Sequence, residues 1–195
     1  SYSYLLESAD EERKWGRYSI IGLQPLLIVL LYDQKMKIHR GGPVETIENV
    51  SDPLPVLRDL QKAFRPVRNP DLSPFQGGLV GYFNYDVVRK WERLPGLSPQ
   101  EGELPEGIFT VSGKMVVFDH LRSKISVVAL ARVEPGRSHE EIYEEACDRV
   151  ERSIEEIEET PPEGDVSRSF LATPLQSNFK REDFTAAVRK AKEHI

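Results

Sequence analysis

The chain has 195 residues, of which 30% are charged, and a formal net charge of −6 at pH 7. This length suffices for one substantial domain or two small ones with a sizeable core. Lys and Arg are scattered among Asp and Glu, so the basic surface typical of nucleic-acid-binding proteins is missing and we expect no nucleic-acid partner.

Cysteine content and the length of apolar runs indicate the cellular compartment and whether a membrane is involved. Cys147 has no second cysteine for an internal disulfide or a metal site, which favours a reducing compartment, most simply the cytoplasm. The longest apolar run, "PLLIVLLY" at 25–32, is shorter than the roughly 20 residues of a membrane-spanning helix. We therefore expect a buried strand there and no membrane partner.

The first third of the chain has the patterns of β-structure. Segments 4–8 and 17–22 are short strand candidates joined by a charged turn, and the apolar run after them predicts a hairpin about Asp33 and Gln34. Asp52 is then expected to cap an amphipathic helix. The apolar side of that helix comprises Leu57, Leu60 and Phe64.

A glycine-rich segment follows, "PFQGGLVGYF", in which three glycines interrupt an apolar and aromatic strand. Neither the spacing of a phosphate-binding loop nor that of a dinucleotide fingerprint is present, so we expect a bent or closely packed strand. A short helix at 87–94 is predicted next, and then two long strands that turn near 121–124.

The last third is predicted to be helical. Residues 139–159 have one apolar stripe, formed by Ile142, Ala146, Val150, Ile154 and Ile157. Residues 161–176 are rich in proline and polar residues and are expected to form a linker, and a helix without a stop signal follows. Both ends read as interior segments, so we expect a fragment of a longer protein. The order of these elements favours an α+β fold of antiparallel β-sheets with covering helices.

The chemistry of the chain is most distinctive at "LLES", where Leu5 and Leu6 precede Glu7 and Ser8. One interpretation is an ordinary strand end with a polar turn. The other is a small pocket, in which the carboxylate pairs with the ammonium of an amino acid and the leucines form an apolar wall. The four histidines lie in separate predicted elements, so we expect no metal or nucleophilic site from them.

Four ordered blocks resemble the large subunit of anthranilate synthase, component I. These blocks are "YLLESADEERKWGRYSIIGLQP", "PFQGGLVGYFNYDVVRKWERLP", "MVVFDH" and "SNFKREDFTAAVRKAKEHI". The large subunit of aminodeoxychorismate synthase has a similar L-L-E-S strand and glycine-rich block, but the continuations "DVVRKWERLP" and "SNFKREDF" look more like anthranilate synthase. A stand-alone small-molecule-sensing domain is the alternative from another class.

The resemblance implies a fold and an activity. The fold would be the N-terminal part of the anthranilate synthase large subunit, an enzyme that converts chorismate and an amino donor to anthranilate and pyruvate. A glutamine amidotransferase subunit (component II) would supply ammonia, Mg²⁺ would assist at the chorismate site, and the whole enzyme would be an oligomer. The metal ligands and catalytic residues of this family lie in the C-terminal domain, so we expect none in this chain and no activity from it alone.

The resemblance also implies a division of the chain. Residues 1–160 would be a regulatory, tryptophan-binding domain, residues 161–176 a linker, and residues 177–195 the first helix of a truncated chorismate-binding domain. In this family the L-L-E-S strand borders the pocket for the end product, tryptophan. The residues implied for that effector site are Leu6, Glu7, Ser8 and Arg17.

Overall fold

The computed structural model divides the chain into two compact units, Ser1–Glu158 and Glu159–Ile195. The residues that it describes are 2–7, 16–95, 104–159 and 177–194. The predicted linker at 161–176 lies outside them. No helix in the described part of the chain combines the length and apolar character needed to cross a membrane.

The first unit is built on one antiparallel sheet. Its strands, within the described residues, are β1 Tyr4–Glu7, β2 Tyr18–Leu31, β3 Lys35–His39, β4 Glu45–Glu48, β5 Val80–Phe83, β6 Gly107–Asp119 and β7 Lys124–Ala129. The main order is β4-β3-β2-β6-β5, with β1 added to β2 and β7 added to β6. Its helices are α1 Leu54–Ala63, the 3-10 helix η1 Tyr85–Lys90 and α2 His139–Glu158. The predicted α+β class is therefore confirmed, as is the hairpin between β2 and β3.

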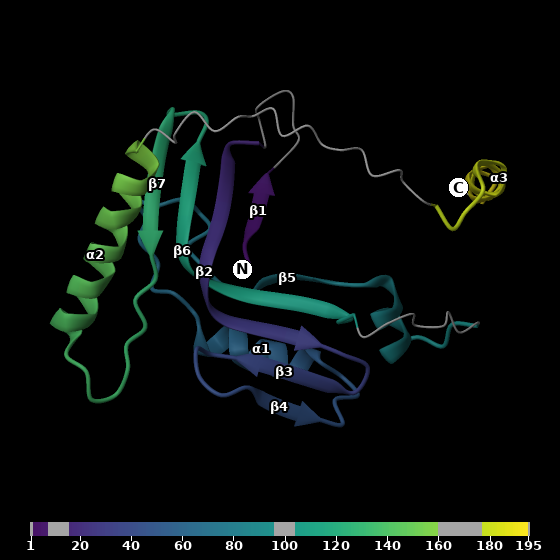
Figure 1. The fold of residues 1–195 in the computed structure, drawn as a ribbon, viewed down its shortest axis with the longest axis horizontal. Coiled ribbons are helices and arrows are strands. Elements are labelled where there is room, and N and C mark those ends of the chain that lie inside the picture. The colour runs from purple at the N-terminus through teal and green to yellow at the C-terminus, as the bar shows by residue number, and fades with distance from the viewer. Residues whose placement is uncertain (1, 8–15, 96–103, 160–176, 195) are drawn as a thin grey trace. The chain divides into compact units, whose positions relative to one another are not determined.

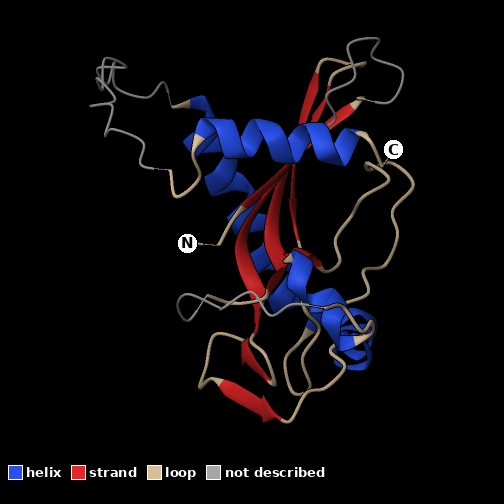
Figure 2. Ribbon diagram, turned by 90° about the vertical axis from the view of Figure 1, so that its right-hand side faces the viewer, coloured by secondary structure: helices blue, strands red, loops and turns tan. Residues whose placement is uncertain are grey.

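Strands β2 and β6 bend, and they link two sections of the sheet (Figure 1). One section contains β1 and β7, and the other contains β3, β4 and β5. The strands predicted separately at 17–22 and 26–32 are one strand, β2, with a register shift between Pro25 and Leu27. This bulge accommodates a proline that cannot donate to the ladder, so the strand continues through Pro25. Figure 2, turned by 90°, shows that strands of the sheet are curved.

Two buried clusters form the core of this unit. The larger one lies under α1 and comprises Leu27, Val29, Leu31, Met36, Ile38, Val50, Leu57, Leu60, Val87 and Val111. The smaller one, in the section with β1 and β7, comprises Ile20, Met115 and Val117. The predicted apolar side of α1 is confirmed, since Phe64 also packs against the larger cluster.

The start of α1 differs from the expectation by one residue. The N-cap is Pro53, and no side chain caps it. Asp52 lies just before it, and its Oδ1 accepts hydrogen bonds from the Leu54 N–H, at 3.0 Å, and from Trp91 Nε1, at 3.2 Å. Proline is well suited to the first turn because its missing N–H would have no helical partner there. Asp52 therefore links the start of α1 to Trp91 and does not cap the helix.

Only the end of the glycine-rich segment is a strand, β5, and the close packing that was predicted is found there. Gly77 and Gly78 have φ angles of +130° and +131°, which side chains rarely adopt. A Cβ at Gly81 in β5 would collide with the backbone of β6. The helix expected at 87–94 is the 3-10 helix η1, which begins earlier because the Asn84 side chain accepts a hydrogen bond from the Val87 N–H.

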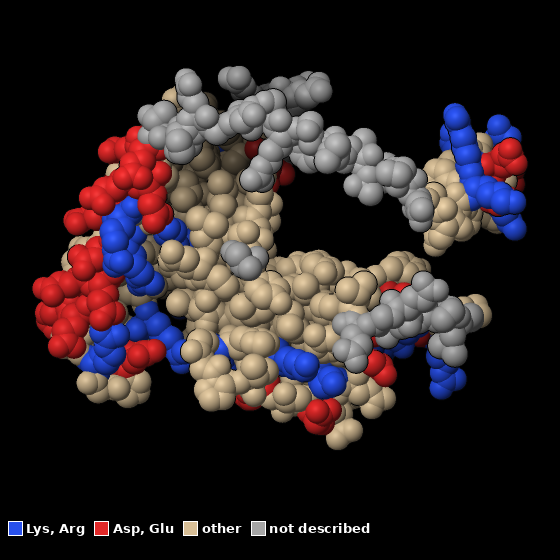
Figure 3. All heavy atoms as spheres, in the orientation of Figure 1, with Lys and Arg blue, Asp and Glu red and all other residues tan. Residues whose placement is uncertain are grey.

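Helix α2 occupies the predicted range, but its buried stripe differs. Ile142, Ala146 and Ser153 are buried, whereas Ile154 and Ile157 are exposed. The physical reason lies on β6, where the buried Lys114 ammonium donates to Ser153 Oγ at 2.8 Å and so turns that side of the helix toward the sheet. Acidic side chains gather along the outer surface of this helix (Figure 3).

The second unit contains one described helix, α3 Arg181–Lys192. Glu182 and Asp183 lie in its first turn and Arg189, Lys190 and Lys192 in its last, an arrangement that stabilises a helix through its dipole. Phe184 and Val188 are exposed on it. The helix predicted for this part of the chain is therefore present.

Candidate functional site

Leu5, Leu6 and Glu7 of the L-L-E-S stretch lie on β1, next to β2, which pairs with β6 on its other side. Leu6 pairs with Ile20 and Glu7 pairs with Ser19, both on β2. Successive side chains of a strand point to opposite faces of the sheet, so Leu6 shares a face with Ile20 while Glu7 shares the other face with Ser19. The structure thus places the carboxylate and the adjacent leucine on different faces.

Three polar side chains form a hydrogen-bonded chain on the Glu7 face. Ser19 Oγ donates to Glu7 Oε1 at 2.9 Å, and His120 Nε2 lies 2.7 Å from the same oxygen of Ser19. Ser19 is only 5% exposed, whereas Glu7 and His120 are exposed. Backbone pairing places His120 here, because its N–H donates to the carbonyl of Arg17 at 2.9 Å and so extends the ladder between β2 and β6.

The donor in each hydrogen bond between Glu7, Ser19 and His120 can be assigned from the protons that these side chains carry. A carboxylate only accepts, so the single hydroxyl proton of Ser19 goes to Glu7. His120 Nε2 must then carry a hydrogen and donate to Ser19. A nucleophilic serine needs the opposite arrangement, with the imidazole accepting its proton. The cluster is therefore suited to holding Glu7 in place and not to nucleophilic catalysis.

Arg17 pairs with Asp119 at the same end of the sheet. Its Nε and Nη2 donate to the two oxygens of Asp119 at 3.0 and 2.7 Å, a bidentate pair, and its guanidinium lies 4.8 Å from the centroid of the Tyr18 ring. Asp119 Oδ1 also accepts from the N–H groups of Leu121 and Arg122 in the turn before β7. Arg17 therefore fixes the turn between β6 and β7 through Asp119.

Replacing Asp119 with asparagine is expected to remove a pH-dependent part of the stability. The hydrogen bond from Arg17 lowers the pKa of Asp119 to about 2, from an ordinary value of 3.8. A carboxyl with a lowered pKa stabilises the fold above the unfolded pKa, and this contribution disappears as pH falls from about 4 toward 2. Urea unfolding of wild type and Asp119→Asn should thus converge across that window.

The matched control for this measurement is Asp59→Asn. Asp59 pairs with Lys62 on the surface, with both side chains more than three-quarters exposed, so this variant should run parallel to wild type across the same pH range. A difference between wild type and Asp119→Asn that stays constant from pH 6 to pH 2.5 would contradict the prediction.

The structure brings together some of the residues predicted for the effector site. Glu7 and Arg17 lie at the same end of the sheet, but Arg17 pairs with Asp119 and not with Glu7. Ser8 lies outside the described residues, and whether the four residues bind an effector stays a prediction. Sequence reasoning missed Ser19 and His120, although both lie in blocks that carry the family resemblance.

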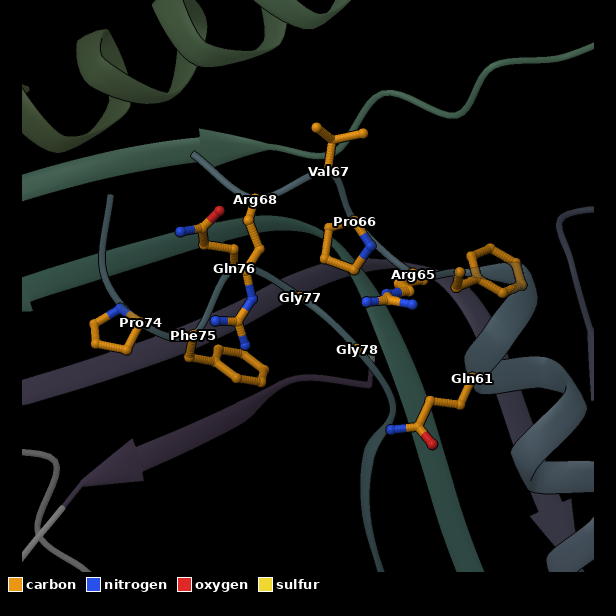
Figure 4. A pocket seen from close by; sticks show the side chains of 11 residues that line it. Gln61, Arg65, Pro66, Val67, Arg68, Pro74, Phe75, Gln76, Gly77 and Gly78 are labelled. Atoms are coloured by element: carbon orange, nitrogen blue, oxygen red, sulfur yellow. The ribbon is translucent and has the colours of Figure 1, made fainter. Parts of the chain in front are cut away.

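Two hollows are relevant to ligand binding. A cavity of about 100 Å³ adjoins the cluster and is lined by Gly16, Arg17, His120 and Leu121. This is less than the about 300 Å³ at which small-molecule sites usually begin. A larger hollow of about 630 Å³ lies between the end of α1 and segment 74–78 (Figure 4). Arg65 and Arg68 line it without any carboxylate, and none of the residues predicted for the effector site does.

Among the described residues, no three His, Cys, Asp or Glu side chains gather so that they could hold a metal ion. The side chains described here therefore do not fit Mg²⁺.

Comparisons with known proteins give one consistent family. Residues 3–195 match the family described as chorismate binding enzyme. The chain is 38% identical to the anthranilate synthase component 1 of Pseudomonas putida over 200 residues, which cover 99% of this chain and 40% of that protein. It is 34% identical to the same component of Acetivibrio thermocellus over 203 residues, which cover 100% and 40%. The resemblance found in the four sequence blocks is thereby confirmed.

The fold is shared with a solved structure. Anthranilate synthase component I from Streptococcus pneumoniae TIGR4 is similar to this chain with a TM-score of 0.59 and 23% identity, over 82% of this chain and 32% of that one. The chain thus spans about 40% of the length of the curated relatives that it matches.

Proposed function

Because the chain belongs to the chorismate binding enzyme family, we propose that it is the N-terminal part of the large subunit of an anthranilate synthase. The observation that carries this proposal is the match of nearly the whole chain to component 1 of that enzyme in two bacteria, at 34% and 38% identity. The blocks "DVVRKWERLP" and "SNFKREDF" support the same choice over aminodeoxychorismate synthase.

The proposed reaction belongs to the whole protein. Chorismate and ammonia would give anthranilate and pyruvate, with the ammonia supplied by a glutamine amidotransferase subunit in an oligomeric enzyme of the cytoplasm. Mg²⁺ would assist at the chorismate site, with ligands outside the residues described here. Residues 1–195 would contribute to regulation and would supply no catalytic groups.

The regulatory role is proposed for the Glu7 face of the sheet. An exposed carboxylate pairs naturally with the ammonium of tryptophan, and Leu5, which is exposed on the same face, offers apolar surface for the indole. Ser8 and Arg17 complete the proposed set, whereas Leu6, predicted for the same site, lies on the other face of the sheet. Tryptophan would inhibit by binding one arrangement of the enzyme more tightly than another, since a ligand shifts an equilibrium only through differential affinity.

The test is an assay of the full-length enzyme. Supplied with chorismate, Mg²⁺ and ammonia, it should produce fluorescent anthranilate, and added tryptophan should inhibit that production. Residues 1–195 alone should produce none under the same conditions. Formation of aminodeoxychorismate by the full-length enzyme would contradict the assignment, and anthranilate from residues 1–195 alone would contradict the division of roles.

A further inference from the structure

We propose that Ser19 and His120 are positioning residues that orient the Glu7 carboxylate for the ammonium group of the effector. The inference rests on the proposed tryptophan site and deepens it, by adding two residues from outside the L-L-E-S stretch. They act through Glu7 and need no contact with the effector.

Glu7 needs such support because of where it lies. It is the last residue of β1, which pairs with β2 alone among the described strands, and its side chain is exposed. Within the described part of the chain, only Ser19 donates a hydrogen bond to this carboxylate. That bond goes to Oε1, so Oε2 is left to accept from an ammonium group.

Ser19 is a firm support for this carboxylate. Its backbone lies in β2 between β1 and β6, paired with Glu7 on one side and Phe118 on the other. The residue is only 5% exposed, so water does not compete for the hydroxyl. A hydrogen bond from a buried hydroxyl to an ionised carboxylate is stronger than one between neutral groups.

His120 fixes the direction of the Ser19 hydroxyl. A serine hydroxyl rotates freely to suit its partners, but a donor at 2.7 Å on its lone pair leaves the proton to point at Glu7. The neutral tautomer with hydrogen on Nε2 and the imidazolium both donate from this nitrogen, so either form maintains the arrangement. The carboxylate is thus oriented before the effector arrives, and less freedom is lost on binding.

The experiment uses the full-length enzyme and measures the inhibition constant of tryptophan. Ser19→Ala should raise this constant about tenfold, which corresponds to about 1.4 kcal/mol. Ser19→Thr keeps the hydroxyl and should restore most of the affinity. In the Glu7→Gln background, Ser19→Ala should add little, because the two residues act through the same contact. The kcat and the KM for chorismate, measured without tryptophan, report whether each variant is folded.

The outcomes separate the two proposals. If Glu7→Gln weakens inhibition and Ser19→Ala does not, the positioning role is wrong and the tryptophan site at Glu7 stands. If Glu7→Gln leaves inhibition unchanged, the site itself is wrong. If Ser19→Ala does not fold, two variants of His120 test the proposal instead. His120→Phe removes the donor and should weaken inhibition by tryptophan. His120→Gln supplies an amide donor and should retain that inhibition. Equal inhibition of these two variants would overturn the positioning role.

Discussion

Replacing Glu106 with glutamine is expected to lower the free energy of unfolding by about 3 kcal/mol, because the buried ammonium of Lys90 loses its one buried ion partner among the described residues. Glu106 lies just before β6, and its Oε2 is 3.3 Å from Lys90 Nζ on η1. Both side chains are about one-tenth exposed or less. The Glu106 backbone is fixed as well, since its N–H donates to the carbonyl of Leu31 at 2.6 Å and its carbonyl accepts from Asn84 at 2.7 Å.

The same lysine provides a matched control. Asp33 also pairs with Lys90, at 3.7 Å, but its side chain is 77% exposed. Asp33→Asn should therefore cost about 1 kcal/mol or less. The double variant Glu106→Gln with Lys90→Met should recover part of the loss, because it removes the buried charge. Urea unfolding followed by tryptophan fluorescence measures all three, and equal losses for Glu106→Gln and Asp33→Asn would refute the explanation.

Sequence patterns predicted the elements whose apolar residues recur regularly. The helices around Leu57 and Ile142, and the hairpin at Asp33, all have such patterns and are present. Strand β4 is not predicted because its sequence, "ETIE", has one apolar residue. Among the described strands it pairs only with the short strand β3. The bulge near Pro25 joins into one strand two segments that the sequence predicts separately, because local patterns do not show that a strand continues through a bulge.

The candidate site could be predicted only in part. Glu7 stands out in the sequence because a carboxylate directly follows an apolar pair. Its partners do not, because Ser19 and His120 are 101 residues apart and meet only through the register of β2 against β6. The same holds for Arg17 and Asp119, which are 102 residues apart. Register is a property of the sheet as a whole, so local patterns could not reveal these contacts.

The buried side of α2 could likewise not be predicted from local sequence patterns. Ile154 and Ile157 continue the apolar period of the sequence, yet Ser153 is buried in their place. A buried lysine on β6 needs hydrogen-bond acceptors, and Ser153 and Glu156 supply them at 2.8 and 3.4 Å. The hydrogen bonds that Lys114 needs thus decide which side of α2 faces the sheet, and Ile154 and Ile157 remain exposed.

Replacing Gly81 with alanine is also expected to lower the stability strongly, because β5 lies very close to β6 at this residue. A Cβ at this position would collide with the carbonyl oxygen of Ile108 and would lie 2.6 Å from the Cα of Phe109. Backbone atoms in a paired strand cannot move aside as a flexible side chain does. Strand β5 would have to shift away from β6, so we expect a loss of about 3 kcal/mol in the free energy of unfolding.

The aromatic contacts of β5 give this prediction a local readout. The Phe83 ring lies edge-on to Phe109, with centroids 4.7 Å apart, and its centroid is 6.2 Å from that of Trp91. A shift of β5 would change the surroundings of Trp91 and therefore its fluorescence in the folded state. Gly42→Ala is the control, because no atom lies within 4 Å of the added Cβ, and it should change stability by less than about 1 kcal/mol. If Gly81→Ala matches Gly42→Ala in stability and in fluorescence, β5 does not depend on a glycine at this contact.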